Sequence, residues 1–120
     1  MNTREGRWDV RLTPAAVHDF DGILEWTADH FGPTQADRYG DTVLDALRTL
    51  RAGPSALGVR PRDDIAPGLM TLPVARGGRK GRHLIVFRIA PGENHPTLDV
   101  LRVLHESMDL PRHLTDDETA

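Results

Sequence analysis

The sequence predicts an α+β fold: a two-layer β-αα-βββ sandwich in which a helical hairpin packs on a mainly antiparallel four-stranded sheet. A short alternating segment is followed by two helical patterns with a three-residue break between them, at residues 32–34. Three strand-like segments then follow, separated by turns. A helical hairpin buries its apolar side by lying across such a sheet, so we expect one domain with two layers.

The alternating segment is the first strand. Trp8, Val10 and Leu12 are separated by Asp9 and Arg11, which is typical of a half-buried strand. Residues 1–7 are polar, and we expect them to be flexible.

The first helix is predicted to begin at Thr13-Pro14, because threonine is a good N-cap and proline fits the first helical position. It should end near Phe31-Gly32. Its apolar face contains Ala16, Phe20, Ile23, Thr27 and Phe31.

The second helix follows so closely that it must return antiparallel to the first, and Gly53-Pro54 should end it. Its apolar face contains Ala36, Tyr39, Val43, Ala46, Leu47 and Leu50. This periodicity places Tyr39 in the core.

Residues 55–68 read as a loop, and the remaining strands are expected at 69–75, 83–90 and 98–104. Pro73 indicates an edge position for the first of these, since proline donates no ladder hydrogen bond. The last two strands are apolar on both faces, which predicts helices over one face and partial shelter over the other. Residues 115–120 form an acidic tail without apolar anchors, and we expect it to be flexible outside the single domain.

Composition excludes several classes of site. The chain has 120 residues, a formal net charge of -3 and no cysteine, so it has no disulfide, thiolate ligand or cysteine nucleophile. The charge gives no general case for nucleic-acid or membrane binding. The six histidines lack metal-ligand spacing, so no metal or cofactor is expected. Without an apolar leader at its start, the chain is expected to be cytoplasmic.

The order of several short motifs resembles the ParE branch of the RelE/ParE superfamily of bacterial toxins, over about residues 10–114. The motifs are Pro14-Ala15-Ala16, Asp19-Phe20, Phe31-Gly32, Arg102-Val103-Leu104-His105, Met108-Asp109 and His113-Leu114. The resemblance implies the β-αα-βββ fold, with the first strand beside the last.

The resemblance also implies a function. ParE-like toxins inhibit DNA gyrase by binding it, and a ParD antitoxin neutralises them. We therefore expect a ParD-like partner in a heterotetramer or larger assembly, without direct sequence-specific nucleic-acid binding. The alternatives are a RelE-type ribosome-dependent mRNA endoribonuclease and a non-toxic relative that only binds its antitoxin.

Cleavage of RNA needs a base, an acid and cations around the phosphate. The only tyrosine is Tyr39, and the C-terminal segment carries Ser107, Met108 and Leu110 where RelE-type enzymes have arginine and tyrosine. We therefore predict no catalytic residue. The polar C-terminal candidates for target binding are Arg102, His105, Arg112 and His113.

Two of these candidates have structural alternatives. Arg102 lies in an apolar strand, so it needs either a buried partner or an exposed face. His105 and Asp109 have a spacing that favours a local hydrogen bond, with Asp109 bracing the chain after the strand.

A glycine-rich basic turn gives four further target-binding candidates. They are Arg76, Arg79, Lys80 and Arg82. They could contact gyrase, its bound DNA or an acidic antitoxin. The alternative is a solvated hairpin that prevents edge-to-edge aggregation.

Apolar residues beside the two helical stripes are candidates for antitoxin binding. They are Val17, Leu24, Trp26 and Leu44. The alternative is that they pad the hairpin edge or the 55–68 loop.

Overall fold

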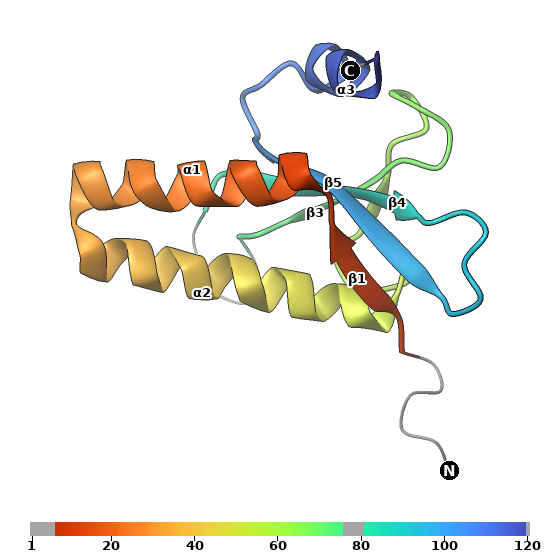
Figure 1. Cartoon of the computed structure of the whole chain (residues 1–120), viewed down its shortest axis with the longest axis horizontal. Coiled ribbons are helices and arrows are strands. Elements are labelled where there is room, and N and C mark those ends of the chain that lie inside the picture. Colours follow the sequence, from red (N-terminus) through yellow and green to blue (C-terminus); the bar gives the residue numbers. More distant parts are fainter. Residues whose placement is uncertain (1–6, 76–80, 120) are drawn as a thin grey trace.

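A computed structural model describes residues 7–75 and 81–119, with side chains described up to Leu114. It confirms the two-layer α+β sandwich (Figure 1). The elements are β1 (Asp9–Leu12), α1 (Pro14–Phe31), α2 (Pro33–Thr49), the 3-10 turn η1 (Leu50–Ala52), β2 (Arg60–Pro61), β3 (Met70–Pro73), β4 (His83–Ile89), β5 (Thr97–His105) and α3 (Leu110–Thr119).

The sheet has the strand order β1-β5-β4-β3-β2. β1 lies beside β5, as the family resemblance implied. This pair is parallel, and the other pairs are antiparallel. The predicted number of four strands is wrong by one, because Arg60 and Pro61 pair with Thr71 and Met70 inside the segment expected to be a loop. Two residues are too few to give an alternating pattern, so β2 left no trace in the sequence.

The helical hairpin forms because a single residue, Gly32, connects α1 to α2. Gly32 has φ +91°, a conformation that favours glycine, and Pro33 starts α2 directly after it. The two helices therefore run antiparallel, side by side, along one side of the sheet (Figure 1).

The main core lies between this hairpin and the sheet. Its fully buried members include Val43 and Leu50 from the hairpin segment and Ile85, Phe87 and Leu98 from the central strands. Burial of this apolar surface is the main favourable contribution to folding.

The other face of β4 and β5 carries a second, smaller core, which confirms that both faces of these strands are covered. Val86 and Leu104 pack there with Leu69, and α3 covers them through Leu110 and Leu114. The helix α3 continues to Thr119, so residues 115–119, predicted as a flexible tail, are helical in the structure. Residues 1–6 and 120, also predicted to be flexible, lie outside the described residues.

A β-bulge decides which side chains of β5 join which core. Val86 stands opposite Arg102, but the next β4 residue, Phe87, stands opposite Val100, so Leu101 is the extra residue. The bulge shifts the alternation of side chains by one. As a result Val100 and Val103 both join the main core, although they are three residues apart.

No α-helix in the described part of the chain is long and apolar enough to cross a membrane.

Candidate functional site: a groove along the open edge of the last strand

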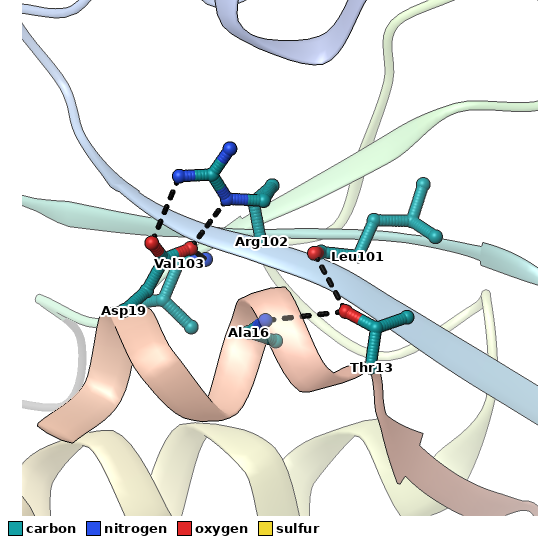
Figure 2. Close-up of polar contacts among 6 residues, drawn as sticks. All are labelled: Thr13, Ala16, Asp19, Leu101, Arg102 and Val103. Carbon is teal, nitrogen blue, oxygen red and sulfur yellow. Dashed lines mark hydrogen bonds and ion pairs between the residues drawn. The ribbon is translucent and has the colours of Figure 1, made fainter. Parts of the chain in front are cut away.

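β5 has an incomplete outer edge. β1 pairs only with residues 97–100 of β5, because the chain turns at Thr13 into α1. The Thr13 hydroxyl donates to the Leu101 carbonyl at 2.9 Å, and its oxygen accepts from the N–H of Ala16 at 3.1 Å (Figure 2). Thr13 thus caps α1 and also provides a hydrogen-bond donor for the carbonyl of the bulge residue, Leu101.

Asp19, six residues after Thr13 on α1, contacts the next part of this edge of β5 (Figure 2). Its carboxylate accepts from Arg102 Nε at 2.6 Å and NH2 at 2.9 Å, and from the backbone N–H of Val103 at 2.9 Å. The side chains of Arg102 and Asp19 are only 16% and 12% exposed. Hydrogen bonding to Asp19 raises the pKa of Arg102 above its ordinary value. Of the two roles expected for Arg102, the structure therefore shows the ion pair.

Beyond this ion pair lies a groove of about 1130 Å³. It is lined by one face of α1, by the start of α2, by the adjoining ends of β4 and β5, and by the chain that follows β5. We call it the α1–β5 groove. It brings together Arg82, Arg102, His105 and His113 from the target-binding candidates and Trp26 from the antitoxin-binding candidates.

The other candidates are not brought into this groove. Arg112 is exposed and does not line it. Arg76, Arg79 and Lys80 lie outside the described residues, so their predicted role stays a prediction.

Of the four apolar antitoxin candidates, Trp26 lines the groove, and Val17, Leu24 and Leu44 do not. Trp26 is 55% exposed and lines the groove, where it stacks on His30 with ring centroids 4.1 Å apart. Val17 and Leu44 are exposed elsewhere, and Leu24 packs against Gly40 between the helices.

Tyr39 packs against the main core, as predicted, but it is only partly buried there. It is half-buried at the groove wall, with its hydroxyl 2.7 Å from Nδ1 of His83. Helical periodicity gave the correct face, but a tyrosine at the edge of a core can pack its ring and still place its hydroxyl on a polar partner. Burial raises the pKa of Tyr39 above its ordinary value.

His83 connects this tyrosine to β5. Its ring lies edge-to-face on that of His105, with centroids 5.3 Å apart. Burial, and then the neighbouring His105, lower the pKa of His83 below its ordinary value of 6.5. The neutral form of His83 is therefore favoured in the folded chain.

His105 is held by Ser107 and not by Asp109, so the predicted partner is wrong. The backbone N–H of Ser107 donates to His105 Nδ1 at 3.1 Å, and the Ser107 hydroxyl lies 2.7 Å from the same nitrogen. The chain turns just after the strand, which brings position i+2 to the ring before a helix begins. Asp109 instead uses its carbonyl, which lies 3.0 Å from Nδ1 of His113.

The described lining of the groove contains more basic than acidic side chains. Asp19 is the only carboxylate among the described residues that line it, and its oxygens are occupied by Arg102 and Val103. The lining also includes Arg82 and four histidines, His18, His83, His105 and His113. Such a surface, with Trp26 and Met108 beside it, fits an apolar segment that carries negative charge.

Comparison with known proteins identifies the family. The model described as "ParE toxin of type II toxin-antitoxin system, parDE" matches residues 10–110. The chain belongs to the ParE toxin family. It is 36% identical over 103 residues to Toxin ParE1 of Mycobacterium tuberculosis, a match that covers 86% of this chain and 94% of that toxin.

Solved structures share the fold of this ParE-type toxin. A chain of the chromosomal ParDE toxin–antitoxin system from P. aeruginosa has a TM-score of 0.67 at 20% identity, covering 84% of this chain and 98% of that one. A chain of the toxin–antitoxin complex RelBE2 from Mycobacterium tuberculosis has a TM-score of 0.56 at 21% identity, covering 82% and 98%. The predicted membership of the RelE/ParE superfamily is confirmed.

Proposed function

We propose that this ParE-type toxin inhibits DNA gyrase by binding it and that a ParD-like antitoxin neutralises it. The observation that carries the proposal is the match to the ParE toxin family over residues 10–110. The ion pair of Arg102 with Asp19 supports binding rather than cleavage, because a carboxylate already holds this arginine. The proposed target implies action in the cytoplasm.

An antitoxin partner is supported by two solved relatives, which are a ParDE system and a RelBE2 toxin–antitoxin complex. The α1–β5 groove offers a suitable surface, with exposed Trp26 next to basic side chains. A heterotetramer or larger assembly with the antitoxin remains part of this proposal.

The direct test is supercoiling of relaxed plasmid by purified gyrase in the presence of the purified chain. Inhibition that is relieved by the protein encoded directly upstream would support both parts of the proposal. Within the target-binding set, Arg82→Ala and His113→Ala should weaken inhibition, while Arg48→Ala, an exposed change on α2 outside the groove, should not. Full supercoiling at saturating toxin would contradict gyrase as the target.

A second candidate function rests on the Tyr39–His83–His105 cluster. A tyrosine and two histidines beside Arg82 supply groups of the kind that acid–base cleavage of RNA requires. Tyr39 and His83 are 2.7 Å apart, which is within reach for proton transfer. This observation favours the RelE-type alternative, cleavage of mRNA on the ribosome.

Cleavage of ribosome-bound message separates the two candidates. The gyrase proposal expects no cleavage above background. Cleavage that Tyr39→Phe or His105→Ala abolishes, in variants that still fold, would establish the RelE-type function. Antitoxin binding with neither activity would identify a non-toxic relative.

A further inference from the structure

Ser107 is an exposed residue of the turn that joins β5 to α3, and it lines the α1–β5 groove. Its hydroxyl oxygen lies 2.7 Å from Nδ1 of His105. The Ser107 backbone N–H also donates to this nitrogen, at 3.1 Å. A backbone N–H only donates, so Nδ1 carries no proton here and accepts the hydroxyl hydrogen as well. The serine hydroxyl is therefore directed at a nitrogen that can take its proton.

Other hydroxyl groups of the described chain have different partners. Five threonine hydroxyls donate to backbone carbonyls, which do not take up a proton at neutral pH; they belong to Thr13, Thr27, Thr42, Thr49 and Thr97. The Tyr39 hydroxyl meets an imidazole nitrogen of His83, but Tyr39 is half-buried. Ser55, the other serine of the chain, is exposed and lies outside the groove. Ser107 combines exposure with an imidazole partner.

His105 is held in place as that partner. Its ring lies edge-to-face on the ring of His83, with centroids 5.3 Å apart, and the Tyr39 hydroxyl lies 2.7 Å from His83. A nucleophile beside a base, with the base oriented by a third group, is the arrangement that nucleophilic catalysis uses. The RelE-type candidate takes the 2′-hydroxyl of RNA as its nucleophile, so it assigns no role to Ser107.

The surroundings of Ser107 suit an apolar acyl group. Met108 and Trp26 contribute apolar surface to the same groove. The Glu106 N–H donates to the Arg82 carbonyl at 2.7 Å, which places Arg82 directly beside the turn. Arg82 also lines the groove. A cation in this lining can stabilise the negative charge that develops on a carbonyl oxygen under attack.

We propose that Ser107 accepts an acyl group from an activated ester or thioester, with His105 as its general base. The Ser107 oxygen bonds to the carbonyl carbon while its proton moves to Nδ1 of His105. The bond from that carbon to the leaving oxygen or sulfur then breaks, and the alcohol or thiol departs with the proton. The product is an acyl-serine whose chain lies in the groove. This reaction needs neither gyrase nor an antitoxin, so it goes beyond the proposed function and is tested separately from it.

The first experiment mixes the purified chain with p-nitrophenyl butyrate. Release of p-nitrophenolate should show a burst of about one equivalent per chain, and peptide mass spectrometry should place the butyryl group on Ser107. Ser107→Ala should lose the burst and the label, while Ser55→Ala should react like the wild type. Equal labelling of the two serines, an unchanged burst in Ser107→Ala, or the absence of any butyryl-serine would overturn the proposal.

The second experiment tests His105 as the base. His105→Gln should slow the labelling of Ser107 by about a hundredfold, whereas His30→Ala, at an exposed histidine outside the groove, should not slow it. Thermal unfolding checks that each variant folds. In His105→Ala, added imidazole should restore part of the labelling rate, because free imidazole can take the serine proton. A wild-type rate in His105→Gln, or no rescue by imidazole in a folded His105→Ala, would overturn the assignment of the base.

Discussion

The two halves of β5 are stabilised in different ways. Residues 97–100 have a strand on each side, with β1 parallel and β4 antiparallel, and the buried apolar side chains of Leu98 and Val100 lie in the main core. Residues 101–105 have a strand on one side only, and two side chains, from the N-cap Thr13 and from Asp19 of α1, satisfy part of the other edge. In the first half, the outer edge of β5 pairs with the backbone of β1. In the second half, the side chains of Thr13 and Asp19 form hydrogen bonds with that edge.

This difference determines which half of β5 can bind a partner through its backbone. A backbone ladder on both sides leaves nothing for a partner to pair with, while an edge sealed by side chains leaves individual groups unpaired. The α1–β5 groove lies along the second half alone. We therefore expect mutations in the first half to affect stability, and mutations in the second half to affect stability and binding together.

The largest expected effect is in the first half. Leu98→Ala removes a fully buried side chain of the main core and should lower the free energy of unfolding by about 3–5 kcal/mol. Urea denaturation measures this change. Ile89→Ala, at the half-exposed residue opposite Leu98, should cost much less. Equal losses would contradict the different burial of these two paired side chains.

Asp19→Ala tests the side-chain hydrogen bonds that stabilise the second half of β5. It leaves the Arg102 guanidinium and the Val103 N–H without their carboxylate, and should cost about 2–3 kcal/mol. The cost stays below that of a fully buried pair because water can reach part of both side chains. Denaturation of the variant measures the loss, and amide exchange at Val103 should accelerate.

Two further variants control for charge. Asp21→Ala removes a neighbouring exposed carboxylate of α1 and should be nearly neutral. The double variant Asp19→Ala with Arg102→Met should recover part of the loss, because it also removes the cation that has lost the Asp19 carboxylate. Without any recovery, the ion pair would not be the source of the effect.

Thr13→Ala should cost about 1–2 kcal/mol, because it removes both the helix cap at Ala16 and the hydroxyl bound to the Leu101 carbonyl. Thr13→Ser keeps the hydroxyl and should retain most of the stability. The chemical denaturation midpoints of the two variants make this comparison. If serine were as damaging as alanine, the methyl group would matter and the hydrogen bonds would not.

The smallest effect concerns pH. His83 has a pKa lowered by burial, so between that pKa and 6.5 the unfolded chain binds more protons than the folded chain. The free energy of unfolding should therefore decrease as the pH falls below 6.5. His105, Asp19 and Glu106 also act on this ring, and Tyr39 bonds to it. His83→Asn should flatten the pH dependence in this range; an unchanged slope would place its origin elsewhere.

The sequence predicted those parts of the fold that depend on local periodicity. Alternation around Val10, the helical stripes and the double-sided apolar pattern of residues 83–90 each reflect burial of whole faces. Pro73 predicted an edge position for its strand, but β2 lies outside β3 in the sheet. This two-residue strand pairs only with Met70 and Thr71, so the pairing ends before Pro73. The strand β2 and the bulge at Leu101 depend on pairing with distant residues, so no local pattern shows them.

The site was harder to predict for the same reason. Arg102 and His105 were singled out as polar residues at the end of an apolar strand, and both line the groove. Asp19, 83 positions before Arg102, appeared in the sequence only as a family motif, and its role needed the packing of α1 on β5. A charged residue inside an apolar strand indicates that a partner exists without saying where it lies.

The bulge makes the last strand sensitive to its exact length. If Leu101 were instead paired with Val86 in a regular ladder, without the bulge, each following residue of β5 would shift by one and its side chain would move to the other face of the sheet. The Arg102 guanidinium would then enter the apolar space beneath the hairpin, and Val103 would leave it. The number of residues between the two ends of β5 therefore carries as much structural information as their chemical character.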